Sequence, residues 1–164
     1  MSLIGLETLP VDYFIAIQGA KEYSTVSFWG PIKEHDSTTT CSFGGWKVLA
    51  GHTPVGLDEG AEYQLVPILE ANGPIDAEIP FRFAAGIWQI DEVGRPWLSE
   101  DTVLWKSFSR ITIITSESGT RLIGRPIMVP RFSTPGMKAL RVTLINRYGV
   151  PVERTTASFA IEVT

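Results

Sequence analysis

The sequence has little cysteine and no long apolar run. Cys41 is the only cysteine among the 164 residues, so an intrachain disulfide and a four-cysteine metal site are both excluded. No stretch approaches the roughly 18 uncharged apolar residues that a membrane-spanning helix requires. The opening segment 1–10 lacks the basic and apolar regions of a secretory signal. We therefore expect a fold stabilised by burial and strand pairing, with no membrane span.

Helical periodicity is also lacking, and a period-two alternation takes its place. The last apolar run shows it, because one face carries Ala157, Phe159, Ile161 and Val163. Similar short runs recur along the chain, with Gly or Pro between them. Their spacing predicts a single all-β domain over residues 1–164, with about nine or ten strands. We expect an antiparallel two-sheet sandwich of the jelly-roll or immunoglobulin-like type, and a distorted β-barrel is the alternative.

The expected strands are bounded by turn residues. They cover Tyr13–Gln18, Tyr23–Trp29, Cys41–Ala50, Ala61–Ile68, Ala77–Ile90, Thr102–Thr115, Arg121–Val129, Lys138–Tyr148 and the last run of the chain. The best hairpin signal is the loop Ser116–Gly119, which β-branched runs flank. Gly44 and Gly45 suggest a bulge or a close backbone approach within one strand. The segments Gly19–Glu22 and Gly51–Gly60 are expected to be loops.

Prolines indicate two places where the sheet ends. Pro67 lies near the end of its strand and favours an edge position, because proline cannot donate a hydrogen bond to a neighbouring strand. Pro126 and Pro130 bracket residues 127–129 and suggest a second edge strand. An exposed edge must be covered or paired, and a neighbouring subunit is one way to do so. We therefore expect a homo-oligomer.

Acidic and basic residues are unevenly distributed along the chain. The net charge is −4, which argues against general nucleic-acid binding. Residues 1–81 carry three basic and eleven acidic side chains, whereas residues 82–164 carry eleven basic and seven acidic ones. Between Lys106 and Arg154 there are nine basic side chains against two acidic ones. These are either solvated strand faces, or a basic face that meets an anionic ligand or the acidic half of another copy.

Residues that could carry catalysis are present, but not in a catalytic pattern. His35 and His52 lie in polar loops, and Asp58 follows them; solvated loop residues explain this cluster better than a metal or acid–base site. A Cys41–His52 dyad is formally possible, but a half-buried core residue fits Cys41 better. Phosphate-binding glycine loops and nucleophile elbows are absent. We predict no cofactor, no bound metal and no enzymatic activity.

Binding residues are easier to propose. Trp29 and Trp97 each lie next to a Gly/Pro turn, and an aromatic side chain at a loop mouth can stack on a sugar ring or be buried in a partner. Together with Arg121, Arg125 and Arg131 they are the predicted partner-binding residues. The run Phe81-Arg82-Phe83 is interpreted differently, as a strand with two core Phe residues and one outward Arg rather than a base-stacking site.

These observations favour binding or assembly over catalysis. In its dense short strands the sequence resembles small viral coat-protein β domains, but it lacks their basic RNA-binding arm, which points to an outer or protruding domain. We predict a structural or recognition module, such as a viral capsid surface (protruding or attachment) domain, on a virion or an extracellular surface. The alternative is a bacterial or phage carbohydrate-binding or adhesin-like module, and an enzyme acting through the His52 loop ranks third. The expected partners are further copies of the chain and a glycan or other anionic surface ligand.

Overall fold

The computed structural model describes residues 11–22, 39–43, 46–50, 55–75, 80–89, 103–117 and 119–164. Within these ranges every regular element is a β-strand, which confirms the predicted all-β class. Accordingly, no helix in this part of the chain could cross a membrane. The twelve strands are β1 (Val11–Gln18), β2 (Lys21–Glu22), β3 (Thr39–Phe43), β4 (Trp46–Ala50), β5 (Val55–Leu57), β6 (Tyr63–Ala71), β7 (Arg82–Gln89), β8 (Val103–Ser116), β9 (Gly119–Gly124), β10 (Ile127–Val129), β11 (Gly136–Ile145) and β12 (Ala157–Val163).

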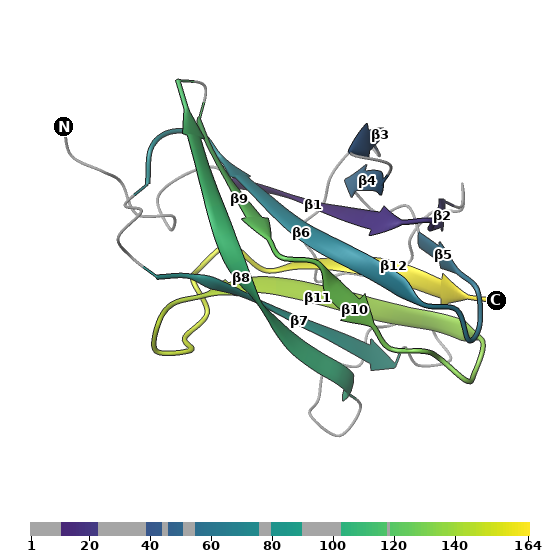
Figure 1. Ribbon diagram of the computed structural model, residues 1–164. Helices are drawn as coiled ribbons and strands as arrows, with labels where there is room; N and C mark the ends of the chain where they lie inside the picture. The colour runs from purple at the N-terminus through teal and green to yellow at the C-terminus, as the bar shows by residue number, and fades with distance from the viewer. Residues whose placement is uncertain are drawn as a thin grey trace.

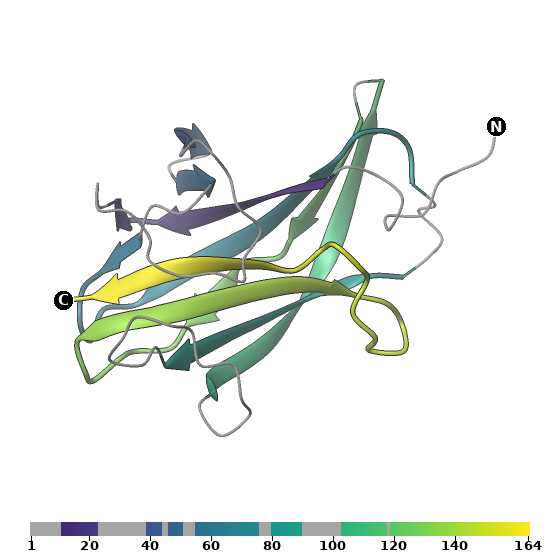
Figure 2. The ribbon, with the colours of Figure 1, turned by 180° about the vertical axis from the view of Figure 1, so that it is seen from behind.

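The described strands form one sheet that curls until its two arms face each other, like half of a barrel (Figures 1 and 2). The strand order is β2-β5-β12-β11-β7-β8-β9-β6-β1-β4-β3, and β10 pairs with β6 beside this path. We call β2, β5, β12, β11 and β7 the β7 arm, and β9, β6, β1, β4, β3 and β10 the β6 arm. Pairing is antiparallel except between β12 and β5. The predicted sandwich of two separate sheets is not confirmed.

The long strand β8 joins the two arms. Its first half, Val103–Arg110, pairs with β7, and its second half, Ile111–Ser116, pairs with β9. A strand of this length twists along its axis, so the sheets that continue from its two halves lie at different angles. Side-chain burial alternates along most of β8, which keeps one face toward the core. In a sandwich, each strand belongs to one of two separate sheets. Here β8 belongs to both arms, so the two arms are parts of one sheet.

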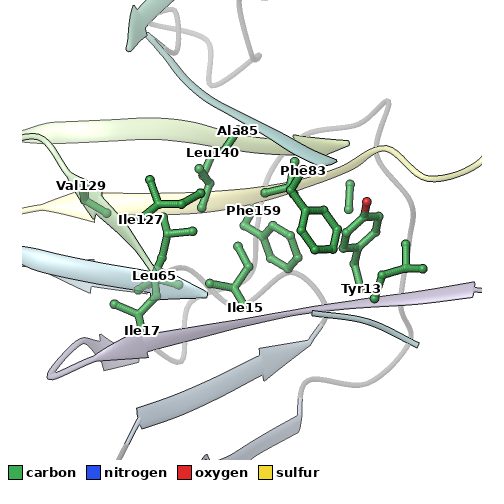
Figure 3. Close-up of a cluster of buried hydrophobic side chains, with 14 of the residues drawn as sticks. Tyr13, Ile15, Ile17, Leu65, Phe83, Ala85, Ile127, Val129, Leu140 and Phe159 are labelled. Atoms are coloured by element: carbon green, nitrogen blue, oxygen red, sulfur yellow. The ribbon is translucent and has the colours of Figure 1, made fainter. Parts of the chain in front are cut away.

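The hydrophobic core lies between the two arms (Figure 3). Tyr13 of β1 meets Phe83 of β7 edge to face, with 5.9 Å between the ring centroids and an interplanar angle of 60°. Other core side chains come from both arms, and they include Ile15, Ile17, Leu65, Leu69, Leu140, Val142 and Leu144. The predicted inward face of the last strand is confirmed, because Ala157, Phe159, Ile161 and Val163 are all buried in this core.

Two expected features of residues 39–60 are wrong. Residues 41–50 do not form one strand, because β3 and β4 pair antiparallel with Phe43 opposite Trp46. The chain therefore reverses direction between these two residues, whereas Gly44 and Gly45 themselves lie outside the described residues. The expected loop 51–60 contains β5, which pairs with β12 and with β2. A three-residue strand is too short to show an alternating pattern, and its partners are distant in sequence.

The hairpin loop expected at Gly19–Glu22 is also partly wrong. Lys21 and Glu22 form β2, which pairs with β5 at the end of the β7 arm. Gly19 has a φ of 75° and Ala20 is buried, so the chain turns immediately after β1 and passes from one arm to the other. The strand expected at Tyr23–Trp29 lies outside the described residues.

Pro67 lies in a central strand, so its predicted edge position is wrong. β6 pairs with β1 on one side and with β9 and β10 on the other. On the second side, Ile68 pairs with Ile123 but Leu65 pairs with Ile127, so the β9–β10 segment holds one extra residue. This β-bulge interrupts the ladder beside Pro67, and a bulge is one of the few places where a sheet tolerates proline. The predicted strand 127–129 is present as β10, and among the described strands it pairs with β6 alone.

A lysine is buried at one end of the core. Lys138 lies on the inward face of β11 and is only 1% exposed. Its Nζ donates a hydrogen bond to the carbonyl oxygen of Thr134 at 3.1 Å and lies 5.3 Å from the centroid of the Phe132 ring. Burial lowers the pKa of Lys138, because removal from water disfavours the charged form.

We expect the Lys138→Met variant to differ from the wild type in the pH dependence of its stability. In the wild type, the folded-state pKa of Lys138 lies below the ordinary value of 10.5, so the unfolded chain binds more protons between these two pH values. The wild type should therefore gain stability relative to the variant as the pH rises toward 10.5. Urea unfolding of both chains across the alkaline range measures this change. A stability difference that is constant with pH would contradict it.

Candidate functional site

The outward face of the β7 arm carries a groove of about 590 Å³. It is lined by β7, β8, β11, the residues just before β12 and the loop between β11 and β12. The outward side chains at the centre of β7 are those of Ala84 and Gly86, whereas β8 and β11 carry larger ones on either side. The groove therefore follows β7; the Ala84 methyl group forms part of its floor, and the Trp88 ring covers Gly86.

Three basic side chains line this groove, and none of its lining residues that the structure describes is acidic. Gly86 pairs with Lys106 of β8 on one side and with Arg141 of β11 on the other. At the usual strand spacing, the Cα atoms of Lys106 and Arg141 are about 10 Å apart across the glycine. Arg82 lies four residues from Gly86 along β7, or about 13 Å away at the usual rise per residue. The groove is thus basic across its width at Gly86 and basic again at Arg82.

Two aromatic rings line the groove. The guanidinium carbon of Arg82 is 5.4 Å from the centroid of the Phe108 ring, a cation–π contact that restrains the arginine. Phe108 is 59% exposed, so its ring remains available to a ligand. The Trp88 ring lies over Gly86; Trp88 is buried, and its Nε1 has no hydrogen-bond partner among the described residues. Aromatic faces beside guanidinium and ammonium groups suit a ligand that has both apolar and anionic parts.

Hydroxyl groups and a rigid loop complete the rim. The hydroxyls of Thr143 and Thr156 are hydrogen-bonded at 2.9 Å on the β11 side of the groove. In the loop after β11, Asn146 Oδ1 accepts hydrogen bonds from the backbone N–H groups of Tyr148 at 2.9 Å and Val150 at 3.0 Å. Gly149 supplies the φ of 79° that the loop requires. The loop contributes lining atoms to the groove and holds Tyr148 in solvent next to it.

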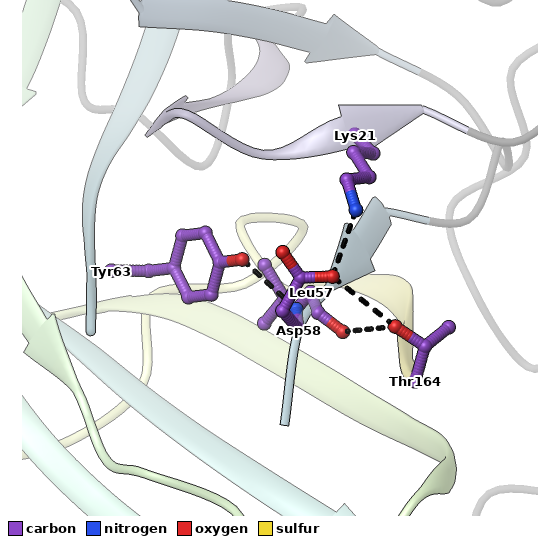
Figure 4. A network of polar contacts seen from close by, with 5 residues as sticks. All are labelled: Lys21, Leu57, Asp58, Tyr63 and Thr164. Carbon is purple, nitrogen blue, oxygen red and sulfur yellow. Dashed lines mark hydrogen bonds and ion pairs between the residues drawn. The ribbon is translucent and has the colours of Figure 1, made fainter. Parts of the chain in front are cut away.

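A second polar cluster surrounds Asp58 (Figure 4). Asp58 Oδ1 accepts hydrogen bonds from Lys21 Nζ at 2.8 Å and from Thr164 Oγ1 at 3.3 Å, and the Asp58 N–H donates to the Tyr63 hydroxyl at 2.9 Å. The hydrogen bond from Lys21 lowers the pKa of the Asp58 carboxyl group, although Asp58 is exposed. The Thr164 N–H donates to the Leu57 carbonyl oxygen at 2.8 Å. These contacts tie Thr164 to the last residue of β5 and to Asp58, which is a structural role.

The predicted partner-binding arginines lie outside the groove. Arg121 in β9 forms an ion pair with Glu70 at 2.7 Å, and Arg131, after β10, forms one with Glu62 at 2.6 Å. Arg125 lies at the β-bulge, where its backbone N–H donates to the Arg110 carbonyl oxygen at 2.9 Å. Its side chain is exposed. Because Arg121 and Arg131 already have carboxylate partners, an incoming anion would compete with these ion pairs.

The remaining predicted partner-binding residues, Trp29 and Trp97, lie outside what the structure describes. So do His35 and His52, which the sequence analysis interpreted as solvated loop residues. Cys41 lies in β3, and its side chain is not described. Among the described residues, no group of three or more His, Cys, Asp and Glu side chains could hold a metal ion.

The sequence analysis did not single out Arg82, Lys106 and Arg141 as site residues. Two signals were available, namely the outward Arg82 between two inward Phe residues and the excess of basic residues after position 106. Each signal points to an exposed positive charge. Neither reveals that β7 lies between β8 and β11, which is what brings the three side chains to one groove.

Comparison with known proteins identifies no family. No family model matches the chain, and no curated protein matches it. Among solved structures, one described as "Structure of the N-terminal domain of PorA" is similar over 92% of this chain and 97% of that chain, at 11% sequence identity and a TM-score of 0.30. The fold and the site described above therefore come from the residues and strand pairings of this chain alone.

Proposed function

We propose that the chain is a non-enzymatic recognition module that binds an anionic ligand in the groove along β7. The observation that supports this most is the meeting of Arg82, Lys106 and Arg141 in one groove on the outward face of the β7 arm. Positive charges in a concave site act on an anion together, and low-dielectric walls strengthen their field. The volume of about 590 Å³ lies within the range of ligand sites in proteins.

The groove can be tested with a variant that removes two of its charges. Lys106→Gln together with Arg141→Gln should weaken binding of sulfated dextran at least tenfold, because hydrogen bonds to charged groups contribute about 1.5–3 kcal/mol each. The matched control is Arg121→Gln together with Arg131→Gln, which changes the net charge equally outside the groove. Isothermal titration at low and high salt measures both, with unmodified dextran as the neutral probe.

The control also tests the arginines predicted from the sequence. Loss of binding confined to the groove variant supports the proposal. Equal loss in both variants would show that only the overall charge matters, and loss confined to the control would move the site to Arg121 and Arg131. Either result, or a wild type that does not bind sulfated dextran, would overturn the proposal.

The setting that we propose for this module is a surface assembly, such as the outer part of a virus particle or a bacterial or phage adhesin. The opposite charges of residues 1–81 and 82–164 support it, since the acidic half of one copy could face the basic half of another. In each copy within such an assembly, the β7 arm and the β6 arm would act as the two layers of a sandwich. Light scattering should then show oligomers that dissociate as salt is added. A salt-insensitive monomer would count against this setting.

A further inference from the structure

Three arginines lie side by side across the outward face of the sheet, where β8 passes from one arm to the other (Figure 1). Arg82 of β7 lies directly opposite Arg110 of β8. On the other side of β8, Ile111 lies opposite Gly124. The same register continues by one residue to Arg110 and Arg125, because the Arg125 N–H donates to the Arg110 carbonyl oxygen at 2.9 Å. Directly opposed residues share a face of the sheet, and all three side chains of this arginine row (Arg82, Arg110 and Arg125) are exposed.

The backbone beneath the arginine row is fixed by the core. Each arginine is next in sequence to a buried residue, namely Phe83, Ser109 or Gly124. The Ser109 hydroxyl donates to the carbonyl oxygens of Arg125 at 2.8 Å and Arg110 at 3.2 Å. A Cβ on Gly124 would lie only 2.8 Å from Ser109 Oγ, so these segments are in close contact. The three positions are therefore ordered before any ligand binds, which lowers the cost of binding.

The three positive charges of the row lie close together and repel one another. Opposed Cα atoms of neighbouring strands are about 5 Å apart, so the row spans about 10 Å. Like charges directly opposite each other destabilise a strand pair. Among the described residues, no carboxylate is paired with an arginine of the row, whereas Arg121 and Arg131 each form an ion pair. A bound anion would offset the repulsion within the row.

The neighbouring side chains on the same face confine the positive charge to the row. The adjacent positions hold Ala84 and Phe108 on one side, and Thr112 and Ile123 on the other. At the β11 end the row stops at Ile145, which is buried. None of these five side chains can be ionised. A compact group with more than one negative charge therefore suits the row better than a long polyanion, whose further charges would lie over uncharged side chains.

A phosphate monoester has the required charge and shape. It carries a charge of about −1.5 to −2 at pH 7 and has three strong acceptor oxygens. Guanidinium groups donate pairs of parallel hydrogen bonds to such oxygens, and arginine does not lose its proton in proteins. A carboxylate has two oxygens and one charge, and a sulfate ester has three free oxygens but again one charge. The phosphate monoester therefore combines the acceptors and the charge that three converging arginines can use.

We infer that the arginine row binds a phosphate monoester group, with Arg110 at the centre and Arg82 and Arg125 on either side. The exposed ring of Phe108 lies 5.4 Å from the guanidinium carbon of Arg82 and can contact the organic part of the ligand. This site goes beyond the proposed function, because it shares only Arg82 with the lining of the groove along β7.

The first test compares ligands that differ in charge. Glucose 6-phosphate and phenyl phosphate present the same group on a sugar and on an aromatic ring, and glucose 6-sulfate is the singly charged control. At about pH 7.5 and low salt, isothermal titration should show the better of the two phosphates binding at least tenfold more tightly than the sulfate, and this phosphate identifies the class of organic part. The advantage should disappear near pH 5, because the second pKa of the phosphate is about 6 and the ester then carries one charge.

Variants that remove one charge test the positions in the row. Arg110→Gln and Arg125→Gln should each weaken phosphate binding at least tenfold, because each loses charge-assisted hydrogen bonds to the ligand. The matched control is Arg131→Gln, which removes one positive charge outside the row and should change the affinity less than twofold. Without phosphate, Arg110→Gln should melt at the same temperature as the wild type or higher, because it relieves the repulsion from Arg82 and Arg125.

Four results would each overturn the inference. They are glucose 6-sulfate binding as tightly as the phosphates at about pH 7.5, a phosphate affinity that does not change toward pH 5, equal effects of Arg110→Gln and Arg131→Gln, and a lower melting temperature for Arg110→Gln, which would assign the row to the fold. The proposed function has a separate readout, because it requires Lys106 and Arg141 for the binding of sulfated dextran. Either one can therefore fail while the other holds.

Discussion

Replacing Phe83 by Ala should lower the free energy of unfolding by about 3–5 kcal/mol. Phe83 is fully buried between the arms and packs edge to face on Tyr13. A Cβ placed on Gly124 would lie only 2.9 Å from Phe83 Cδ2, so the ring is also closely packed from the β9 side. Truncation would leave a cavity, because the closely packed neighbours of Phe83 cannot move far enough to fill it. A loss of this size is a large part of the 5–15 kcal/mol by which a typical domain is stable.

Phe108→Ala is the matched control for this experiment. Phe108 lies on β8 next to the partner of Phe83, but it faces outward and is 59% exposed. Its removal should change stability by less than about 1 kcal/mol. Urea unfolding followed by tryptophan fluorescence measures both variants. Similar losses for the two would mean that Phe83 is not a central part of the core.

The local features of the fold could be predicted because they depend on residues that are close together in the sequence. The alternation of Ala157, Phe159, Ile161 and Val163 gives the inward face of β12, since successive strand residues point to opposite faces. The turn between β8 and β9 could likewise be located, because Gly119, at the predicted position, has a φ of 147°. Both signals depend on neighbours within a few residues.

The order of the strands could not be predicted, because it depends on contacts between distant segments. β5 pairs with β12 across more than a hundred residues, with Val55 opposite Ile161. Pro67 shows the same limit, since a β-bulge some sixty residues later in the chain makes its central position possible. A single sequence carries no local trace of such pairings. The groove depends on the same information, because Lys106 and Arg141 approach each other only when β7 lies between their strands.

The floor of the groove leads to a second prediction of large effect, Gly86→Ala. Residues two apart on a strand share a face, and the Trp88 ring lies over Gly86. A Cβ at position 86 would lie 2.5 Å from Trp88 Cη2 and 2.6 Å from Cζ3, closer than real side chains approach. The indole must therefore move, and overpacking of this kind costs about 1–3 kcal/mol. The absence of a side chain at Gly86 thus makes room for the Trp88 ring, which packs over the backbone there.

A double-mutant cycle with Trp88→Leu identifies the cause of that cost. The smaller leucine removes the ring atoms that a methyl group at position 86 would meet, so Gly86→Ala should cost much less in the Trp88→Leu background, with a coupling energy of about 1–3 kcal/mol. Gly149→Ala is the control, because it has open space around it and a φ of 79°. Its cost of about 1 kcal/mol arises from the backbone and should be the same in both backgrounds. If Gly86→Ala also costs the same in both, the contact with Trp88 is not what requires glycine there.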